Sequence, residues 1–291
     1  AFMPITAGNP LQPAFNNLFS THLPGDPITD NGTRHVQNAA YSFVQPAPVL
    51  HPELLLWSDE TAAILNLPTE LKTDVDFINV LAGNALGKNS KPYATVYGGH
   101  QFGHWAGQLG DGRAINLGEL PSGSKHFTLQ LKGAGPTPYS RHADGRAVLR
   151  SSIREFLCSE ALFHLGIAST RALSLVNSQS LAMRDMFYDG HPKNENCAIV
   201  GRVSESFLRF GHFELPSARE DVSLLRQIAD YAIQQHFPAI VVQSEQRYAQ
   251  FFEAICQSTA KLLAQWMSVG FVHGVMNTDN MSILGETIDY G

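Results

Sequence analysis

The C-terminal segment, residues 273–291, contains the side chains best suited to chemistry. Asn280 and Asp289 offer an amide oxygen and a carboxylate, and Mg²⁺ prefers such hard oxygen ligands, with phosphate and water completing its shell. Asp279 is the only carboxylate between His273 and Asn280, and it could take a proton from a hydroxyl group. An aspartate in a loop can also simply cap a turn. The segment therefore predicts a metal-dependent reaction on a phosphate-bearing substrate, with Asp279 as the candidate base.

The spacing of these residues matches the catalytic segment of protein kinases, with one exception. That segment runs H-R-D-x-x-x-x-N and is followed by a metal-binding D-F-G. Aligning His273 with the histidine puts Asn280 on the asparagine and residues 289–291, Asp-Tyr-Gly, on D-F-G. The position of the catalytic aspartate is then Val275, which cannot accept a proton. The chain either binds nucleotide and metal without catalysis or uses another base, for which Asp279 is the candidate.

A lysine and a glutamate farther upstream could hold the phosphates of a nucleotide. Lys132 ends a predicted strand, and Glu155 lies on the next predicted helix. In kinases a strand lysine contacts the phosphates and a helix glutamate positions that lysine. Each residue alone is more typical of a solvent-exposed surface. Their order, after a glycine-rich run and before the segment 273–291, favours the phosphate-binding interpretation.

Arginines could add further phosphate contacts. The run Gly110-Asp-Gly-Arg113 offers backbone N–H groups and a guanidinium group to phosphate oxygens, although D-G is also a common hairpin turn. Arg202 and Arg209 lie among aromatic residues and glycines, where they could bind phosphate or form surface salt bridges. Both interpretations stay open for these arginines on the residues alone.

The predicted elements place these residues in a strand-rich half followed by a helical half. Strands 113–120 and 125–132 are predicted to form a hairpin around a turn at 121–124. The glycine-dense run 94–112 is expected to form a loop or strand edges. Further strands are predicted at 172–183 and 198–203, and helices at 54–65, 146–165, 221–236 and 246–267. This order predicts an α+β fold.

The predicted helix 146–165 carries two rows of residues on different sides. The apolar row is expected to face the core, and it consists of Leu149, Ile153, Phe156, Leu157 and Phe163. The second row runs along the side of the helix and consists of Val148, Ser152, Glu155 and Ser159.

Composition narrows the class of protein. With 291 residues, 44% of them hydrophobic and 16% charged, the chain can form a large globular core or two lobes. A net charge of −6 without a long basic run disfavours nucleic acid as the main partner. No apolar run reaches the roughly 18–20 residues of a membrane span, and the N-terminus lacks a signal peptide. Three widely spaced cysteines indicate a reducing compartment, so we expect a cytoplasmic protein.

Four long blocks of the chain are similar to the selenoprotein O family of pseudokinases. They are YGGHQFGHWAGQLGDGRA (97–114), LQLKGAGPTPYSRHADGRAVLRSSIREFL (129–157), VGRVSESFLRFGHFE (200–214) and HGVMNTDNMSILGETIDYG (273–291). The blocks are distinctive and extend over nearly the whole chain after its N-terminal segment.

The resemblance implies a kinase-like fold and the transfer of AMP from ATP to Ser, Thr or Tyr hydroxyls of proteins. The nucleotide is flipped relative to a kinase, so that the α-phosphate faces the acceptor. Transfer of UMP with Mn²⁺, or a catalytically silent nucleotide-binding scaffold, are the alternatives. Carried over by motif, nucleotide contacts fall on Gly110, Gly112, Arg113, Lys132, Asp144, Gly145, Arg202, Arg209 and Asp289. The resemblance also implies Asp279 as base, Asn280 and Asp289 as ligands of Mg²⁺ or Mn²⁺, and Glu155 as the partner of Lys132.

The resemblance further implies three regions. Residues 1–93 form an extended, wrapping segment with short helices, residues 94–215 a kinase-like N-lobe, and residues 216–291 the beginning of a helical C-lobe. Family members continue well past the D-Y-G, so we expect this chain to be truncated at its C-terminus. The rest of the helical lobe and a redox-active C-terminal residue would then be missing.

Overall fold

The structure is a computed structural model that describes residues 12–290, so the expectations for residues 1–11 and for Gly291 lie outside it. The strands are β1 (Gly25–Asp26), β2 (Tyr41–Phe43), β3 (Glu53–Trp57), β4 (Tyr93–Thr95), β5 (Gly98–Gln101), β6 (His104–Gln108), β7 (Ala114–Ser122), β8 (Lys125–Lys132), β9 (Ala147–Val148), β10 (Arg171–Arg184) and β11 (Lys193–Ser204). The helices are α1 (Leu18–His22), α2 (Asp59–Ile64), α3 (Val75–Leu81), α4 (Leu149–His164), α5 (Gly211–Ala218), α6 (Val222–His236) and α7 (Arg247–Ser268), with 3₁₀ turns η1 (Thr69–Thr73) and η2 (Thr278–Asn280).

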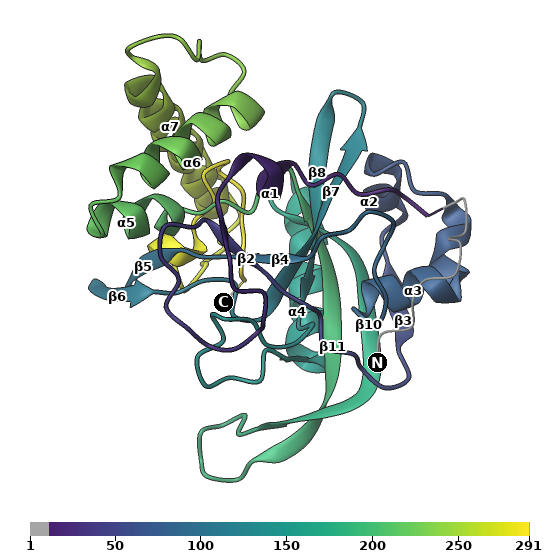
Figure 1. Ribbon diagram of the computed structural model, residues 1–291. Helices are drawn as coiled ribbons and strands as arrows, with labels where there is room; N and C mark the ends of the chain where they lie inside the picture. The colour runs from purple at the N-terminus through teal and green to yellow at the C-terminus, as the bar shows by residue number, and fades with distance from the viewer. Residues whose placement is uncertain (1–11, 291) are drawn as a thin grey trace.

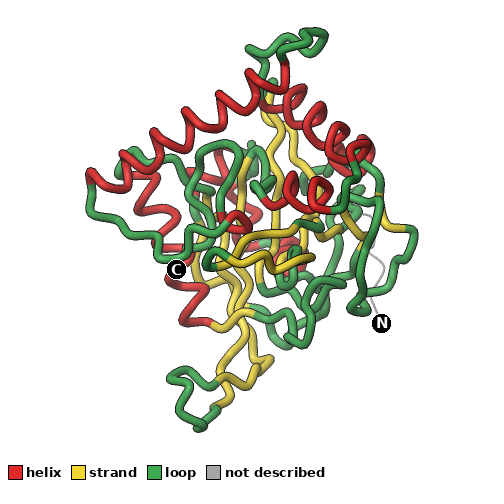
Figure 2. Tube along the Cα trace, turned by 90° about the vertical axis from the view of Figure 1, so that its left-hand side faces the viewer, coloured by secondary structure: helices red, strands yellow, loops and turns green. Residues whose placement is uncertain are grey.

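The architecture is mixed α+β, as predicted. One large sheet has the strand order β1-β2-β4-β7-β8-β11-β10-β3, with β9 paired to β11, and β5 and β6 form a separate hairpin. Helices α5, α6 and α7 lie together on one side of the molecule, and the yellow C-terminal segment runs between them and the sheet (Figure 1). The hairpin of β10 and β11 projects beyond the body of the molecule (Figure 2). The C-terminal segment thus lies where the two halves meet.

The central hairpin confirms the prediction for residues 113–132. Strands β7 and β8 pair antiparallel with Ser122 opposite Lys125, and Gly123 occupies the turn with a positive φ of 61°. Strand β8 is paired on its other side with β11, which places Lys132 between Ala114 and Val200. A residue flanked by two strands has little freedom, so the sheet determines where the Lys132 side chain points.

The prediction of a helix over 54–65 is wrong in its first half. Residues 54–57 belong to strand β3, which pairs with β10, and helix α2 begins only at Asp59. The side chain of Ser58 accepts a hydrogen bond from the backbone N–H of Thr61 and so caps the helix there. The short apolar run before Ser58 suits a buried strand as well as a helix, and its pairing with β10 decides for the strand.

Helix α4 begins three residues later than predicted and buries a different face. Residues 147–148 form β9 against β11 instead of the first helical turn. In the predicted apolar row Ile153, Leu157 and Phe163 are exposed. The buried residues of the helix are Ser152, Glu155, Phe156, Ser159 and Leu162. The helix therefore turns its polar row inward, because Glu155 has charged partners there and the Ser159 hydroxyl donates to the carbonyl of Thr170 at 2.5 Å.

The helical half agrees with the predictions for residues 221–236 and 246–267. Asp221 caps α6 by accepting a hydrogen bond from the N–H of Leu224 at 2.9 Å. Helix α5 was not predicted, because it begins at a glycine and contains Pro216. None of the helices in the described part of the chain is both long and apolar enough to cross a membrane.

Candidate functional site

The predicted site residues line one polar cavity of about 810 Å³. It is lined by all the predicted catalytic, nucleotide-binding and metal-binding residues, namely Gly110, Gly112, Arg113, Lys132, Asp144, Gly145, Arg202, Arg209, Asp279, Asn280 and Asp289. Eight lysine and arginine side chains and four aspartates line it. A chain with a net charge of −6 therefore concentrates positive charge around one cavity, which suits an anionic ligand.

Lys132 and Glu155 form the expected pair. The Nζ atom of Lys132 lies 2.7 Å from Oε2 of Glu155, and both side chains are 10% exposed. Burial alone raises the pKa of Glu155, but the charges of Lys132 and Arg202 outweigh burial and lower it below its usual value. Glu155 therefore stays ionised and holds the lysine at the cavity wall.

Asp289 is the centre of the charged cluster. Its Oδ1 lies 2.7 Å from Lys132 Nζ and 2.7 Å from an Nη atom of Arg202, and its Oδ2 contacts Arg209. Burial raises the pKa of this carboxyl, but the three cations outweigh it and hold the pKa well below its usual value. The backbone of Asp289 has a φ of 57°, which L-residues rarely adopt. That conformation is tolerated where the carboxylate gains strong partners.

Arg202 and Arg209 are buried, so they do not form surface salt bridges. They are 2% and 3% exposed. Burial lowers the pKa of each guanidinium group, yet Asp289 and its neighbours raise both above the ordinary value. Arg202 also donates to Gln130 Oε1 at 3.0 Å, and Gln130 lies on β8 two residues before Lys132. Gln130 belongs to the cluster although it was not predicted; its position on the same face of β8 as Lys132 was the available signal.

A second residue that the sequence did not single out is Asp111, inside the predicted glycine run. Its carboxylate accepts hydrogen bonds from the backbone N–H and hydroxyl of Thr95, at 2.9 and 2.6 Å, and lies 3.8 Å from Arg209. Only 2% of Asp111 is exposed. It therefore ties the run 110–113 to β4 and supports Arg209.

Asp279 and Asn280 lie side by side in the turn η2. The backbone carbonyl of Asp279 accepts a hydrogen bond from Arg209 at 2.8 Å, and its Oδ2 accepts one from Gln101 Nε2 at 2.9 Å. Its Oδ1 is buried and has no hydrogen-bond partner among the described residues. Asp279 thus lines the cavity with a carboxylate that keeps one oxygen without a hydrogen-bond partner among the described residues.

His273 stabilises the loop that carries these residues. Its Nδ1 accepts from the backbone N–H of Val275 at 3.3 Å, and its Nε2 lies 2.8 Å from the carbonyl of Ile288. The ring is buried and stacked on Trp266. His273 therefore joins the two ends of the segment and has a structural role.

Gly110 and Gly145 are required by the packing of the cavity wall. Both have positive φ values, 149° and 67°. A Cβ atom on Gly110 would lie 2.5 Å from the ring of Tyr139, and one on Gly145 would lie 2.2 Å from the carbonyl group of Gly135. These glycines therefore serve close backbone contacts, whether or not they also approach a ligand.

Asp144 and Arg113 stand at the outer part of the cavity. The carboxylate of Asp144 accepts two hydrogen bonds from Arg184, at 2.7 and 2.8 Å, and one from the N–H of Arg146. The hydrogen bonds from Arg184 are the main reason why the pKa of Asp144 is lowered. Arg113 is exposed at the rim. The charge of Asp144 is thus paired with Arg184.

The donor set at Asn280 and Asp289 fits a magnesium or manganese ion. Both residues line the cavity with oxygen donors of the kind these ions prefer. Both oxygens of Asp289 also contact cations. These cations would therefore compete with a metal ion for this carboxylate.

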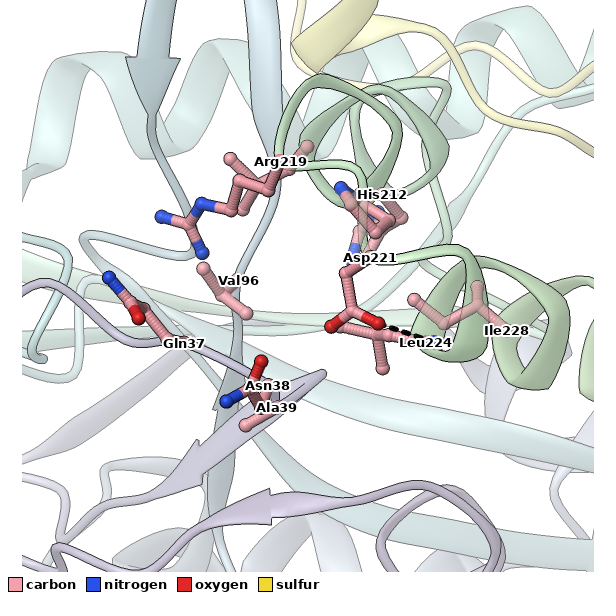
Figure 3. A pocket seen from close by; sticks show the side chains of 11 residues that line it. Gln37, Asn38, Ala39, Val96, His212, Arg219, Asp221, Leu224 and Ile228 are labelled. Atoms are coloured by element: carbon pink, nitrogen blue, oxygen red, sulfur yellow. Dashed lines mark hydrogen bonds between the residues drawn. The ribbon is translucent and has the colours of Figure 1, made fainter.

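Two other hollows contain none of the predicted site residues. An apolar groove of about 840 Å³ between α5, α6 and α7 is lined by residues such as Phe213, Phe251 and Ile255. A smaller cavity of about 260 Å³ lies between residues 37–39 and helices α5 and α6 (Figure 3). Its wall includes His212, whose Nδ1 accepts from the N–H of Arg209 at 2.9 Å. Burial, and secondarily Arg209, lowers the pKa of His212 to about 3, so its ring is neutral.

Glu286, three residues before Asp289, gives a pH-dependent prediction. Burial raises its pKa from 4.5 to about 7, despite a hydrogen bond from Ser204 at 2.7 Å. The folded protein then binds one more proton than the unfolded chain between these pH values, so stability falls as the pH rises through this window. We expect Glu286→Gln to stabilise the protein by about 1–3 kcal/mol at pH 8 and to leave the free energy of unfolding nearly unchanged at pH 4.5.

Urea unfolding of both proteins at the two pH values measures this difference. Glu253 on α7 is exposed, so Glu253→Gln is the matched control. It should change the free energy of unfolding little at either pH value. A stabilisation by Glu286→Gln that does not depend on pH would contradict the prediction.

Comparison with known proteins gives consistent matches. The family model described as protein adenylyltransferase SelO matches residues 30–291. Proteins named protein nucleotidyltransferase YdiU from Nitrosospira multiformis and Xanthomonas axonopodis pv. citri are both 59% identical, over 280 and 278 residues. One from Aromatoleum aromaticum is 57% identical over 281 residues. Each alignment covers 95% of this chain but only 50–54% of the relative, so the chain spans about half the length of these proteins.

Proposed function

Because the chain belongs to the SelO family of protein adenylyltransferases, we propose that it transfers AMP from ATP to Ser, Thr or Tyr hydroxyls of proteins and releases pyrophosphate. The proposal includes a protein-kinase-like arrangement, with an N-lobe over 94–215 and a C-lobe that begins at 216. The observation that carries it is a cavity that is lined by Asp279, by the oxygen donors of Asn280 and Asp289, and by eight basic side chains.

The basic residues would bind the triphosphate. Lys132, Arg202 and Arg209 share the carboxylate of Asp289, and phosphate oxygens are the alternative acceptors for their N–H groups. Phosphoryl-type transfer depends mostly on positioning and on neutralising charge. In the flipped orientation these three cations would hold the β- and γ-phosphates, which form the leaving pyrophosphate, and would leave the α-phosphate towards Asp279.

Asp279 would act on the acceptor hydroxyl through its carboxylate, which lines the cavity. The acceptor oxygen forms a bond to the α-phosphorus while the bond from that phosphorus to the oxygen bridging to the β-phosphate breaks. The bridging oxygen leaves with the electron pair as part of pyrophosphate, and the hydroxyl proton passes to the carboxylate of Asp279. Asn280 and Asp289 would hold Mg²⁺ or Mn²⁺, which when bound neutralises charge on the phosphates.

Paired labelling tests this function. The protein is incubated with a protein acceptor such as casein and with ATP labelled at either the α- or the γ-phosphate. We expect label on protein from α-labelled ATP only. Label from the γ position alone would indicate a kinase and overturn the proposal.

The same assay distinguishes the other candidates. Stronger transfer from α-labelled UTP with Mn²⁺ would assign UMP transfer instead. A thermal shift with Mg-ATP, but no label from either position, would favour a nucleotide-binding scaffold.

A further inference from the structure

The β5–β6 hairpin packs directly on the loop that carries Asp279. It is separate from the large sheet and touches η2 and α5. A Cβ atom on Gly99 would lie 3.0 Å from Cβ of Asp279, and one on Gly211, at the start of α5, would lie 2.0 Å from the carbonyl oxygen of Gly98. The hairpin backbone is therefore in close contact with both elements.

Three consecutive hairpin residues bind three consecutive loop residues. The N–H of His100 donates to Thr278 Oγ1 at 2.8 Å, and the N–H of Phe102 donates to Asn277 Oδ1 at 3.0 Å. Between them, the amide of Gln101 donates to Oδ2 of Asp279 at 2.9 Å. Two of these bonds attach the hairpin to the loop, and only the third reaches the proposed base.

Glu214 on α5 binds both the β5–β6 hairpin and the loop that carries Asp279. Its Oε1 lies 2.9 Å from His100 Nδ1, and its Oε2 accepts from the hydroxyl of Thr278 at 2.5 Å. The hairpin would therefore stay attached without Gln101. This separates the contact between Gln101 and Asp279 from the attachment of the hairpin.

We propose that Gln101 is a positioning residue that orients the carboxylate of Asp279. Its hydrogen bond engages Oδ2, while Oδ1 is buried and has no hydrogen-bond partner among the described residues, so this bond restrains the orientation of the carboxylate. The amide is neutral, so it restrains the carboxylate through a directional hydrogen bond and adds no charge to the site. This inference rests on the proposed role of Asp279.

Two substitutions test the proposal through kcat and the KM for ATP. Gln101→Leu removes the donor and should lower kcat by about 10–100-fold, with the KM for ATP unchanged, because a misdirected base loses rate and not nucleotide binding. Gln101→Glu keeps the size of the side chain but replaces the donor by an acceptor, so its kcat should fall at least as far.

The exposed His104, which pairs with Gln101 across the hairpin, supplies the control. His104→Ala keeps the hairpin and should stay within about twofold of the unchanged protein, since it alters no contact with the loop. Normal kcat in either the Gln101→Leu or the Gln101→Glu variant would overturn the inference, and so would a loss confined to the KM for ATP.

A measurement without turnover keeps the inference separate from the proposed function. If the unchanged protein transfers no label, the function fails, but NMR of the ¹⁵N-labelled glutamine amides and ¹³C-labelled aspartate carboxyls still decides the contact. Asp279→Asn should shift the side-chain amide signal of Gln101, whereas the exposed control Asp230→Asn should not. An amide signal that Asp279→Asn leaves unchanged overturns the inference.

Discussion

Replacing Asp289 by asparagine is expected to destabilise the protein and to abolish the effect of Mg²⁺ on ATP binding. The change leaves Lys132, Arg202 and Arg209 close together without the carboxylate they share. Removing one partner of a buried ion pair typically costs about 3–5 kcal/mol, and we expect about 2–4 kcal/mol for this carboxylate, whose side chain is 19% exposed.

The pH dependence of this loss follows from the lowered pKa of Asp289. A carboxyl with a lowered pKa contributes its stability above its unfolded value and loses it only as the pH falls through the folded value. The difference between the two proteins should therefore stay constant from pH 5 to 8 and shrink only below about pH 4. Denaturant unfolding across this range measures it.

Calorimetry of ATP binding with and without Mg²⁺ provides the second measurement on Asp289→Asn. We expect metal-free ATP to bind no more weakly than before, since three cations have lost a competing partner, and Mg²⁺ to add nothing. Asp230→Asn removes an exposed pair with Arg247 and is the control, with an expected cost below about 1 kcal/mol. An undiminished gain in affinity with Mg²⁺ would count against Asp289 as a metal ligand.

Replacing Asp279 by asparagine is expected to lower AMP transfer by about 10²–10⁴-fold, the usual contribution of a general base. ATP affinity should stay unchanged, because the Asp279 side chain makes no contact with the basic cluster in the structure. The melting temperature should not fall, since the lost oxygen has no partner among the described residues and an amide oxygen can still accept from Gln101. Label transfer, calorimetry and a thermal melt measure the three quantities.

Asp230→Asn again serves as the control and should transfer label at the normal rate. Asp279→Asn with normal transfer would exclude Asp279 as the base. Equal losses of transfer and of ATP affinity would instead indicate a disturbed nucleotide site.

Some of the fold was predictable because it depends on local patterns. The hairpin around Gly123 and the helix capped by Asp221 follow from turn residues, alternation and capping, which act over a few residues. The inward face of α4 was not predictable in this way. Its periodicity favours Ile153 and Leu157 as core residues, but the cations that pair with Glu155 come from the distant strands β8 and β11.

For the candidate site, the sequence alone determined which side chains could do chemistry and how they are spaced between His273 and Asp289. A base, a metal-type donor pair and a strand lysine can be read from residue types and motif order. The tertiary structure alone decided which side chains contact one another. Three cations contact Asp289, Asp111 accepts hydrogen bonds from Thr95, and Gln101 donates a hydrogen bond to Asp279. These contacts join residues far apart in the chain, so they depend on how the sheet, the hairpin and helix α5 pack, which no local pattern specifies.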